Sequence, residues 1–171
     1  MSELYKIVLT SSLTVLGGIF MFVCGQIITK FFIEPIHEQK RLIGEIADSL
    51  IFYANLYGNP EYPKTEKTYE ASKVLRQQAS QLRAKTHAIP WYKLWQFLSI
   101  VPKGSNVVEA SSNLIGLSNV MCDDHYQRAL KEQDSENVGS YSREFTDYLT
   151  DLRKQISEYV EKIKKSLHIK I

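Results

Sequence analysis

The sequence predicts an all-α protein in which a single N-terminal transmembrane helix is followed by a cytoplasmic helical bundle. Two observations support this fold class. The stretch Ile7–Thr29 contains no charged residue and lies between Lys6 and Lys30, and the later segments place their apolar residues at helical spacing. No segment is convincing as a strand. We therefore divide the chain into a transmembrane anchor, residues 1–33, and a cytoplasmic helical domain, residues 34–171.

The uncharged stretch is long enough to cross a bilayer. A helix rises about 1.5 Å per residue and the hydrocarbon core is roughly 30 Å thick, so about 20 apolar residues suffice. A buried core helix of this length would usually show a polar face. A cleaved signal peptide has a shorter apolar region and a small-residue cleavage site. The stretch has neither feature, which favours a permanent anchor.

The flanking charges predict the orientation of this anchor. Lys6 is the only lysine or arginine before the span, whereas Lys30, Lys40 and Arg41 follow it closely. Basic residues favour the cytoplasmic side of a membrane. The sequence therefore predicts a single-pass protein with its N-terminus outside and its C-terminal domain in the cytoplasm.

One face of the predicted span carries small and hydroxyl side chains, at Ser11, Thr14, Gly18, Gly25 and Thr29. Small residues let membrane helices approach closely, and hydroxyl groups can form hydrogen bonds between them. This stripe predicts self-association into a homo-oligomer, with a lone anchor as the alternative, since such residues are ordinary in membrane helices. No ionisable residue lies inside the span, which argues against ion-coupled transport.

Helices joined by turns are expected after the span. Pro35 lacks a backbone donor, so we expect the membrane helix to end or kink there. Gly116 is expected at a close crossing of two helices. Ser105 or Asn106 is expected to cap the start of the helix that contains Gly116. Glycine, proline and asparagine mark the turns. The expected helices cover residues 35–57, 65–88, 107–132 and 141–168, and the turns cover 58–63, 102–106 and 135–140.

The segment between Pro90 and Pro102 holds both tryptophans of the chain and is rich in large side chains. Three interpretations are open. The rings can pack in the core, or the segment can lie on the membrane with its rings among the headgroups and Lys93 above them. Alternatively, rings and nearby cations bind bases and phosphates. The candidate ligand-binding residues are Arg76, Arg83, Lys85, Trp91, Tyr92, Lys93, Trp95 and Lys103.

The sequence contains no convincing catalytic or metal motif. Cys122 to His125 is the only metal-like cluster, and a structural zinc site needs four ligands. Phosphate-binding loops, nucleophile elbows and H-E-x-x-H motifs are absent from the sequence. We therefore expect no enzyme activity, no metal and no cofactor. A net charge of +2 gives no reason to expect binding to a DNA or RNA duplex.

Three phrases carry a resemblance: FFIEPIHEQKRLIGEIADSLIFYANLYGNP, EASKVLRQQASQLRAK and NLIGLSN. They resemble a loose group of small bacterial proteins that have one N-terminal span and a helical cytoplasmic part. The chain is also similar to CRISPR-associated membrane effectors of type III systems, which bind cyclic tetra-adenylate and act on the membrane. This resemblance implies a bacterial inner-membrane location and assigns no site residue.

Together these observations predict a non-enzymatic, membrane-anchored effector. Its cytoplasmic domain would bind a small anionic ligand, with a cyclic oligoadenylate as the candidate, and would act on the membrane in antiviral defence. The alternative is a membrane-tethered oligomeric scaffold that recruits a protein partner through its C-terminal helix.

Overall fold

The computed structural model describes residues 3–58, 65–122 and 138–169, and their side chains except those of 138–146. Every regular element in these ranges is a helix, which confirms the all-α class. The elements are α1 (Glu3–Ile28), η1 (Thr29–Ile33), α2 (Glu34–Phe52), α3 (Ala54–Gly58), α4 (Glu66–His87), α5 (Tyr92–Phe97), α6 (Gly104–Met121) and α8 (Val138–Leu167).

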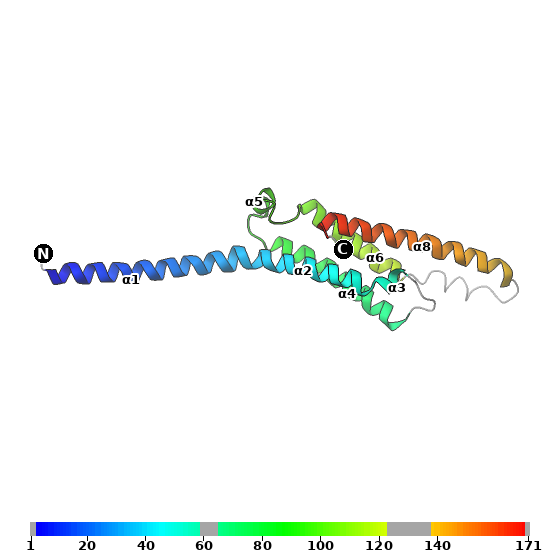
Figure 1. Ribbon diagram of the computed structural model, residues 1–171, viewed down its shortest axis with the longest axis horizontal. Helices are drawn as coiled ribbons and strands as arrows, with labels where there is room; N and C mark the ends of the chain where they lie inside the picture. Colours follow the sequence, from blue (N-terminus) through cyan, green and yellow to red (C-terminus); the bar gives the residue numbers. More distant parts are fainter. Residues whose placement is uncertain (1–2, 59–64, 123–137, 170–171) are drawn as a thin grey trace.

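The first three elements form one continuous helix, whose α1 part projects from the rest of the molecule (Figure 1). No residue of α1 is buried, so it is not a core helix of the domain. Its 26 residues correspond to roughly 39 Å. Among the described residues, this continuous helix alone is long and apolar enough to cross a membrane.

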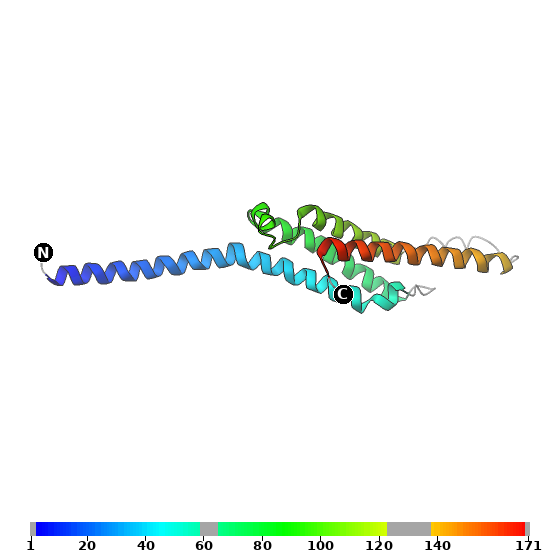
Figure 2. The ribbon, with the colours of Figure 1, turned by 45° about the horizontal axis from the view of Figure 1, so that its top comes forward.

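A wider helical turn accommodates Pro35. Element η1 is a π-helix, in which the Glu34 N–H donates to the carbonyl of Thr29, five residues earlier. The Thr29 hydroxyl donates in turn to the Gly25 carbonyl at 2.9 Å. Figure 2 shows the long helix changing direction in this region. The predicted kink is confirmed, but the alternative of a helix end at Pro35 is wrong, because the π turn pairs the donor that precedes the proline.

The remaining helix boundaries differ from the predicted ones at several points. Tyr53 breaks the predicted 35–57 helix into α2 and α3. Helix α6 begins at Gly104 with Lys103 in the capping position, so the expected serine or asparagine cap is wrong, and it ends at Met121. Helix α8 already begins at Val138, inside the predicted loop. Residues 59–64 and 123–137 lie outside the described residues, and with them most of the predicted 58–63 turn and the first half of the predicted 135–140 turn.

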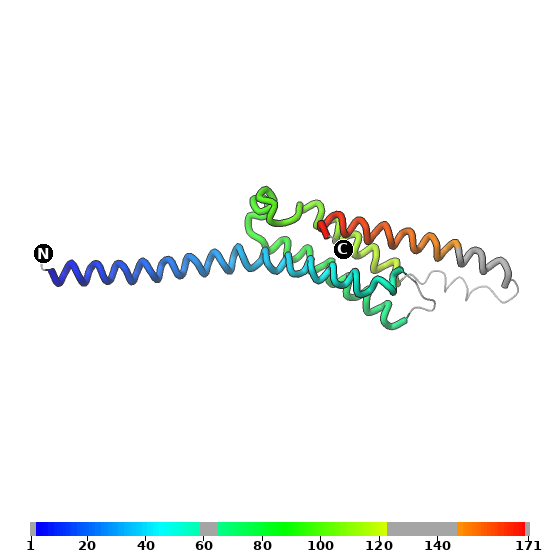
Figure 3. The backbone as a smooth tube through the Cα atoms, in the orientation of Figure 1, coloured from blue at the N-terminus to red at the C-terminus, as the bar shows by residue number. Residues whose placement is uncertain are grey.

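One apolar core joins α2, α4, α6 and α8. Helix α6 packs against both α4 and α8, and the tube in Figure 3 shows α8 running back alongside it. The helical spacing found in the sequence therefore marks the buried faces. The core residues include Leu42, Ile46, Leu50, Ala71, Leu75, Ala79, Leu82, Val107, Ala110, Leu114, Leu117, Met121, Leu152, Ile156, Val160, Ile163 and Leu167.

Gly116 lies where α6 and α8 approach closely, as predicted. A Cβ atom placed on Gly116 would lie 2.6 Å from Cε1 and 2.8 Å from Cζ of Tyr159. These separations are far shorter than a carbon–carbon contact of about 3.5–4.0 Å. The tyrosine ring therefore occupies the space that any larger residue at position 116 would need.

We expect Gly116→Leu to destabilise the domain by about 1–3 kcal/mol, because the new side chain collides with Tyr159. Gly44→Leu is the matched control: it also replaces a helical glycine, but no atom lies within 4 Å of its added Cβ. That control should be neutral or stabilising, since leucine is the better helix former. Chemical denaturation followed by circular dichroism measures both, and equal effects would contradict the crossing.

Candidate functional site

The two predicted arginines of α4 both contact α6. The Nη2 atom of Arg76 donates to Oδ1 of Asn119 at 2.6 Å. Two turns further along α4, Nη2 of Arg83 donates to Oγ of Ser112 at 2.9 Å. Both guanidinium groups remain exposed to solvent. They are therefore equivalent in chemistry but lie at different places along the α4–α6 interface.

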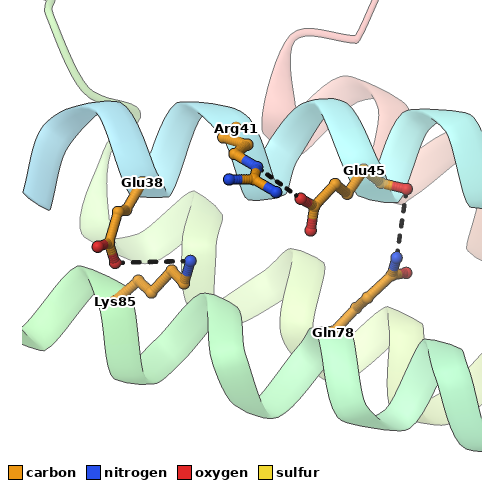
Figure 4. Close-up of polar contacts among 5 residues, drawn as sticks. All are labelled: Glu38, Arg41, Glu45, Gln78 and Lys85. Atoms are coloured by element: carbon orange, nitrogen blue, oxygen red, sulfur yellow. Dashed lines mark hydrogen bonds and ion pairs between the residues drawn. The ribbon is translucent and has the colours of Figure 1, made fainter.

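Lys85 lies on another side of α4 and faces α2. Its Nζ is 3.6 Å from Oε2 of Glu38, and the two side chains approach each other across the helices in Figure 4. Further along the same interface, Nε2 of Gln78 donates to the Glu45 carbonyl at 3.2 Å. Lys85 therefore belongs to the polar contacts that join α2 to α4.

A groove lies between α4, α5 and the start of α6, and we call it the α4–α6 groove. Its volume is about 460 Å³. Of the predicted ligand-binding residues, Arg83 and Tyr92 line it, and no carboxylate does. His87 was not predicted, although its position four residues after Arg83 signals a shared helix face. The lining residues are Arg83, Thr86, His87, Ile89, Tyr92, Gly104, Val107 and Val108.

A buried amide connects this groove to α2. Gln39 is fully buried, and its Nε2 donates to Oγ1 of Thr86 at 2.7 Å and to the Tyr92 hydroxyl at 3.3 Å. The Tyr92 hydroxyl donates to the Pro102 carbonyl at 2.7 Å. Gln39 was also missed from the sequence, where its place midway between Ile36 and Leu42 on an apolar face was the available signal.

The Tyr92 phenol stays neutral at physiological pH. Burial raises its pKa above the usual value, and the hydrogen bond from Gln39 acts in the opposite direction. A neutral phenol can donate and accept at once, as this one does. The hydrogen bonds that Gln39 and Tyr92 form at this junction are therefore uncharged, next to the ion pair of Lys85 and Glu38.

The N-terminal end of α6 adds partial positive charge to the groove. Gly104, its first residue, is part of the lining, and Lys103 in the capping position gives no side-chain hydrogen bond to the helix end. The backbone N–H groups at a helix start favour anions. With Arg83 alongside, the groove combines two kinds of anion-binding group.

The other predicted ligand-binding residues lie elsewhere. Trp91 and Trp95 pack around Phe32, with ring centroids at 5.3 Å and 6.3 Å. Lys93 is exposed on α5. Lys103 lines a second groove of about 460 Å³, together with Lys40, His168 and other residues. The eight predicted residues are thus distributed over several places, and only Arg83 and Tyr92 share the α4–α6 groove.

The stripe of small residues, which runs along α1 and ends at the first residue of η1, is open along its length. All five of its members are exposed, and nothing lies within 4 Å of a Cβ placed on Gly18 or Gly25. The hydroxyl of Thr14 donates to the Thr10 carbonyl at 2.9 Å, as Thr29 does to Gly25. These two hydroxyls are therefore satisfied within the helix itself.

Metal-ligand chemistry has no geometry to support it in the described part of the chain. No group of three or more His, Cys, Asp or Glu residues able to hold a metal occurs there, and Cys24 and Cys122 are free thiols. Residues 123–125 of the metal-like cluster lie outside the described residues.

The chain matches no protein-family model, no curated protein and no solved structure. Its site must therefore be interpreted from its own residues.

Proposed function

We propose that this protein is a membrane-anchored, non-enzymatic effector that binds a small anionic ligand in the α4–α6 groove. In this proposal α1 crosses the bacterial inner membrane with its N-terminus outside, and the helical domain lies in the cytoplasm. The observation that carries the proposal is the contact of Gln39 with Thr86 and Tyr92. It joins two residues of the groove to the helix that continues into the span.

The groove has the chemistry that an anion requires. Arg83 carries five N–H donors, of which the hydrogen bond to Ser112 uses one. His87 supplies a further donor, and the helix dipole at the start of α6 adds partial positive charge, although its Gly104 N–H already donates to Gln96. No acidic side chain among the lining residues opposes a negative charge. The phosphate of a nucleotide is the kind of group that such donors bind.

Ligand binding reaches the membrane through Gln39. A ligand that moves Thr86 or Tyr92 changes the hydrogen bonds of this buried amide. The Oε1 atom of Gln39 is buried and accepts no hydrogen bond within the described residues, so the junction can gain a donor when it rearranges. Because α2 and α1 form one helix, a shift at Gln39 alters the angle or rotation of the span. The proposal therefore requires a coupling free energy between ligand binding in the α4–α6 groove and the position of α1.

The groove volume constrains the ligand. A cavity of about 460 Å³ is suited to one drug-sized molecule, so a ring of four nucleotides would not fit in one groove. A cyclic oligoadenylate would have to place successive nucleotides in the grooves of several subunits. Binding of a cyclic oligoadenylate would therefore require a homo-oligomer, which the open stripe of small residues on α1 also favours.

We expect Arg83→Ala to weaken ligand binding by about 10- to 100-fold, because a hydrogen bond to a charged group contributes about 1.5–3 kcal/mol. Arg76→Ala is the matched control: it removes the same charge from the same helix and also breaks contacts to α6, here the two to Ser118 and Asn119. That variant should bind within about twofold of the native chain. Isothermal titration of the full chain with inorganic phosphate, AMP and a panel of cyclic oligoadenylates measures the affinities.

Two results of that titration would contradict the proposal. One is the absence of heat with every probe from a folded protein. The other is an equal loss of affinity in Arg76→Ala and Arg83→Ala, which would show only a general effect of charge. The stoichiometry separates the ligands, since a cyclic oligonucleotide shared by several subunits would bind at less than one molecule per chain.

The scaffold alternative receives less support from the packing. The apolar stripe of α8, which includes Leu152, Ile156 and Ile163, is buried against the rest of the domain. A partner that binds through this stripe would have to displace α6. The rest of its described surface is mostly polar and charged, which suits solvent rather than a hydrophobic interface.

A further inference from the structure

We propose that α5 docks on the lipid bilayer and inserts its outer side chains among the headgroups. This inference rests on the membrane-spanning role of α1 in the proposed function, and adds a second point of membrane contact. The outer side chains, which we call the α5 face, are Trp91, Leu94, Phe97 and Leu98. Leu94 is three residues after Trp91, and Phe97 and Leu98 are three and four residues after Leu94, which places them on one side of a helix.

The polarity of α5 is the reverse of that expected for a helix in water. The α5 face is largely exposed, with Trp91 at 71% and Phe97 at 84%. The side chains on the other face form hydrogen bonds toward the domain, among them the Tyr92 hydroxyl with Gln39. An exposed patch of large apolar residues commonly marks a surface that is covered in the working protein.

Hydrogen bonds hold the segment in this orientation. The indole N–H of Trp95 donates to the Pro90 carbonyl at 3.0 Å, and Oε1 of Gln96 accepts the N–H of Gly104 at 3.2 Å. Trp91, the capping residue just before α5, has φ of 51°, in the left-handed region that a bulky residue seldom adopts. Trp91 is 71% exposed in this backbone conformation.

The position of α5 identifies the bilayer as the occupant. Phe32 packs against Trp91 and Trp95, and it lies two residues beyond Lys30, which ends the uncharged stretch. In a helix that crosses the hydrocarbon core, this is the level of the headgroups. Figure 1 shows α5 at the end of the domain nearest to α1. The α5 face therefore continues the apolar surface of the span.

Basic side chains surround this region. Lys93 is exposed on α5 itself. The second groove beside it contains Lys40, Lys103 and His168 in its lining, and no carboxylate. Aromatic and aliphatic side chains flanked by lysines are typical of segments that lie in a bilayer interface, and such lysines favour anionic lipids. A lipid surface thus fits the charge as well as the apolarity of α5.

The intrinsic fluorescence of the chain tests this directly, because both tryptophans belong to this segment. The probe is the full chain in nanodiscs of anionic lipid whose acyl chains are brominated near the headgroup. In Trp95→Phe, Trp91 is the only tryptophan left to emit, and we expect the brominated lipid to quench at least about half of this tryptophan emission. Acrylamide in the water should quench this emission weakly.

The double variant Leu94→Asp, Phe97→Asp in the same background should lose most of the lipid quenching and gain quenching by acrylamide. Both positions are exposed, so circular dichroism should be unchanged. Strong acrylamide quenching of Trp91 in Trp95→Phe, without the two aspartate substitutions, would overturn the proposal, since α5 would then face water. Protection from both quenchers would overturn it too, because a second protein copy would cover the face. If α1 itself were not a span, the chain would not float with the nanodiscs, which separates the two failures.

Discussion

The double substitution Leu16→Arg, Phe20→Arg should release the protein from the membrane. An arginine near the centre of a spanning helix disfavours insertion by about 2.5–3.5 kcal/mol, so two together oppose it by roughly 5–7 kcal/mol. Both side chains are exposed, at 62% and 66%, and so the domain loses no contact. Flotation of cell membranes followed by alkaline extraction should find the native chain with the lipid and the variant in the soluble or aggregated fraction.

The control adds the same charges outside the proposed span. Ile51 and Phe52 at the far end of α2 are also exposed apolar residues, at 55% and 76%. Ile51→Arg, Phe52→Arg should leave the protein in the membrane fraction, because neither position lies in the bilayer. Retention of the Leu16 and Phe20 variant after alkaline extraction would contradict the spanning role of α1. Its proper folding can be checked by the helical circular dichroism of the domain.

The sequence was sufficient to predict the helices because their periodicity follows directly from burial. Leu75, Ala79 and Leu82 lie on one face of α4, and this spacing arises because that face is buried in the core. The absence of charge between Lys6 and Lys30 and the close packing at Gly116 were equally local signals. Each of these features depends on residues that are close together in the chain.

The features that the sequence did not reveal depend on contacts between distant segments. Propensity rules predict a break at Pro35, but not that a π turn would carry the helix through it. Arg83 and Lys85 are two residues apart, yet one faces α6 and the other α2, so residue type alone grouped them wrongly in space. Gln39 pairs with Thr86 and Tyr92, far along the chain. The candidate site was therefore predictable in its chemistry and not in its geometry.

We expect the largest loss of stability from Leu114→Ala. Leu114 is fully buried at the centre of α6, the helix that packs against both α4 and α8. Truncation of a buried leucine to alanine removes about 2–5 kcal/mol, depending on how far the cavity collapses. For a domain of this size the midpoint of thermal unfolding should fall by roughly 10 °C or more.

Val108→Ala is the matched control for this loss, because Val108 lies on the same helix but is 54% exposed. It should change stability by less than about 0.5 kcal/mol. Circular dichroism of the full chain in nanodiscs measures both midpoints. Equal shifts of the two unfolding midpoints would mean that α6 is not the centre of the core. The packing that positions the α4–α6 groove would then be wrong. A large shift confined to Leu114→Ala would instead support α6 as the centre of the core, against which α4 packs with the groove residue Arg83.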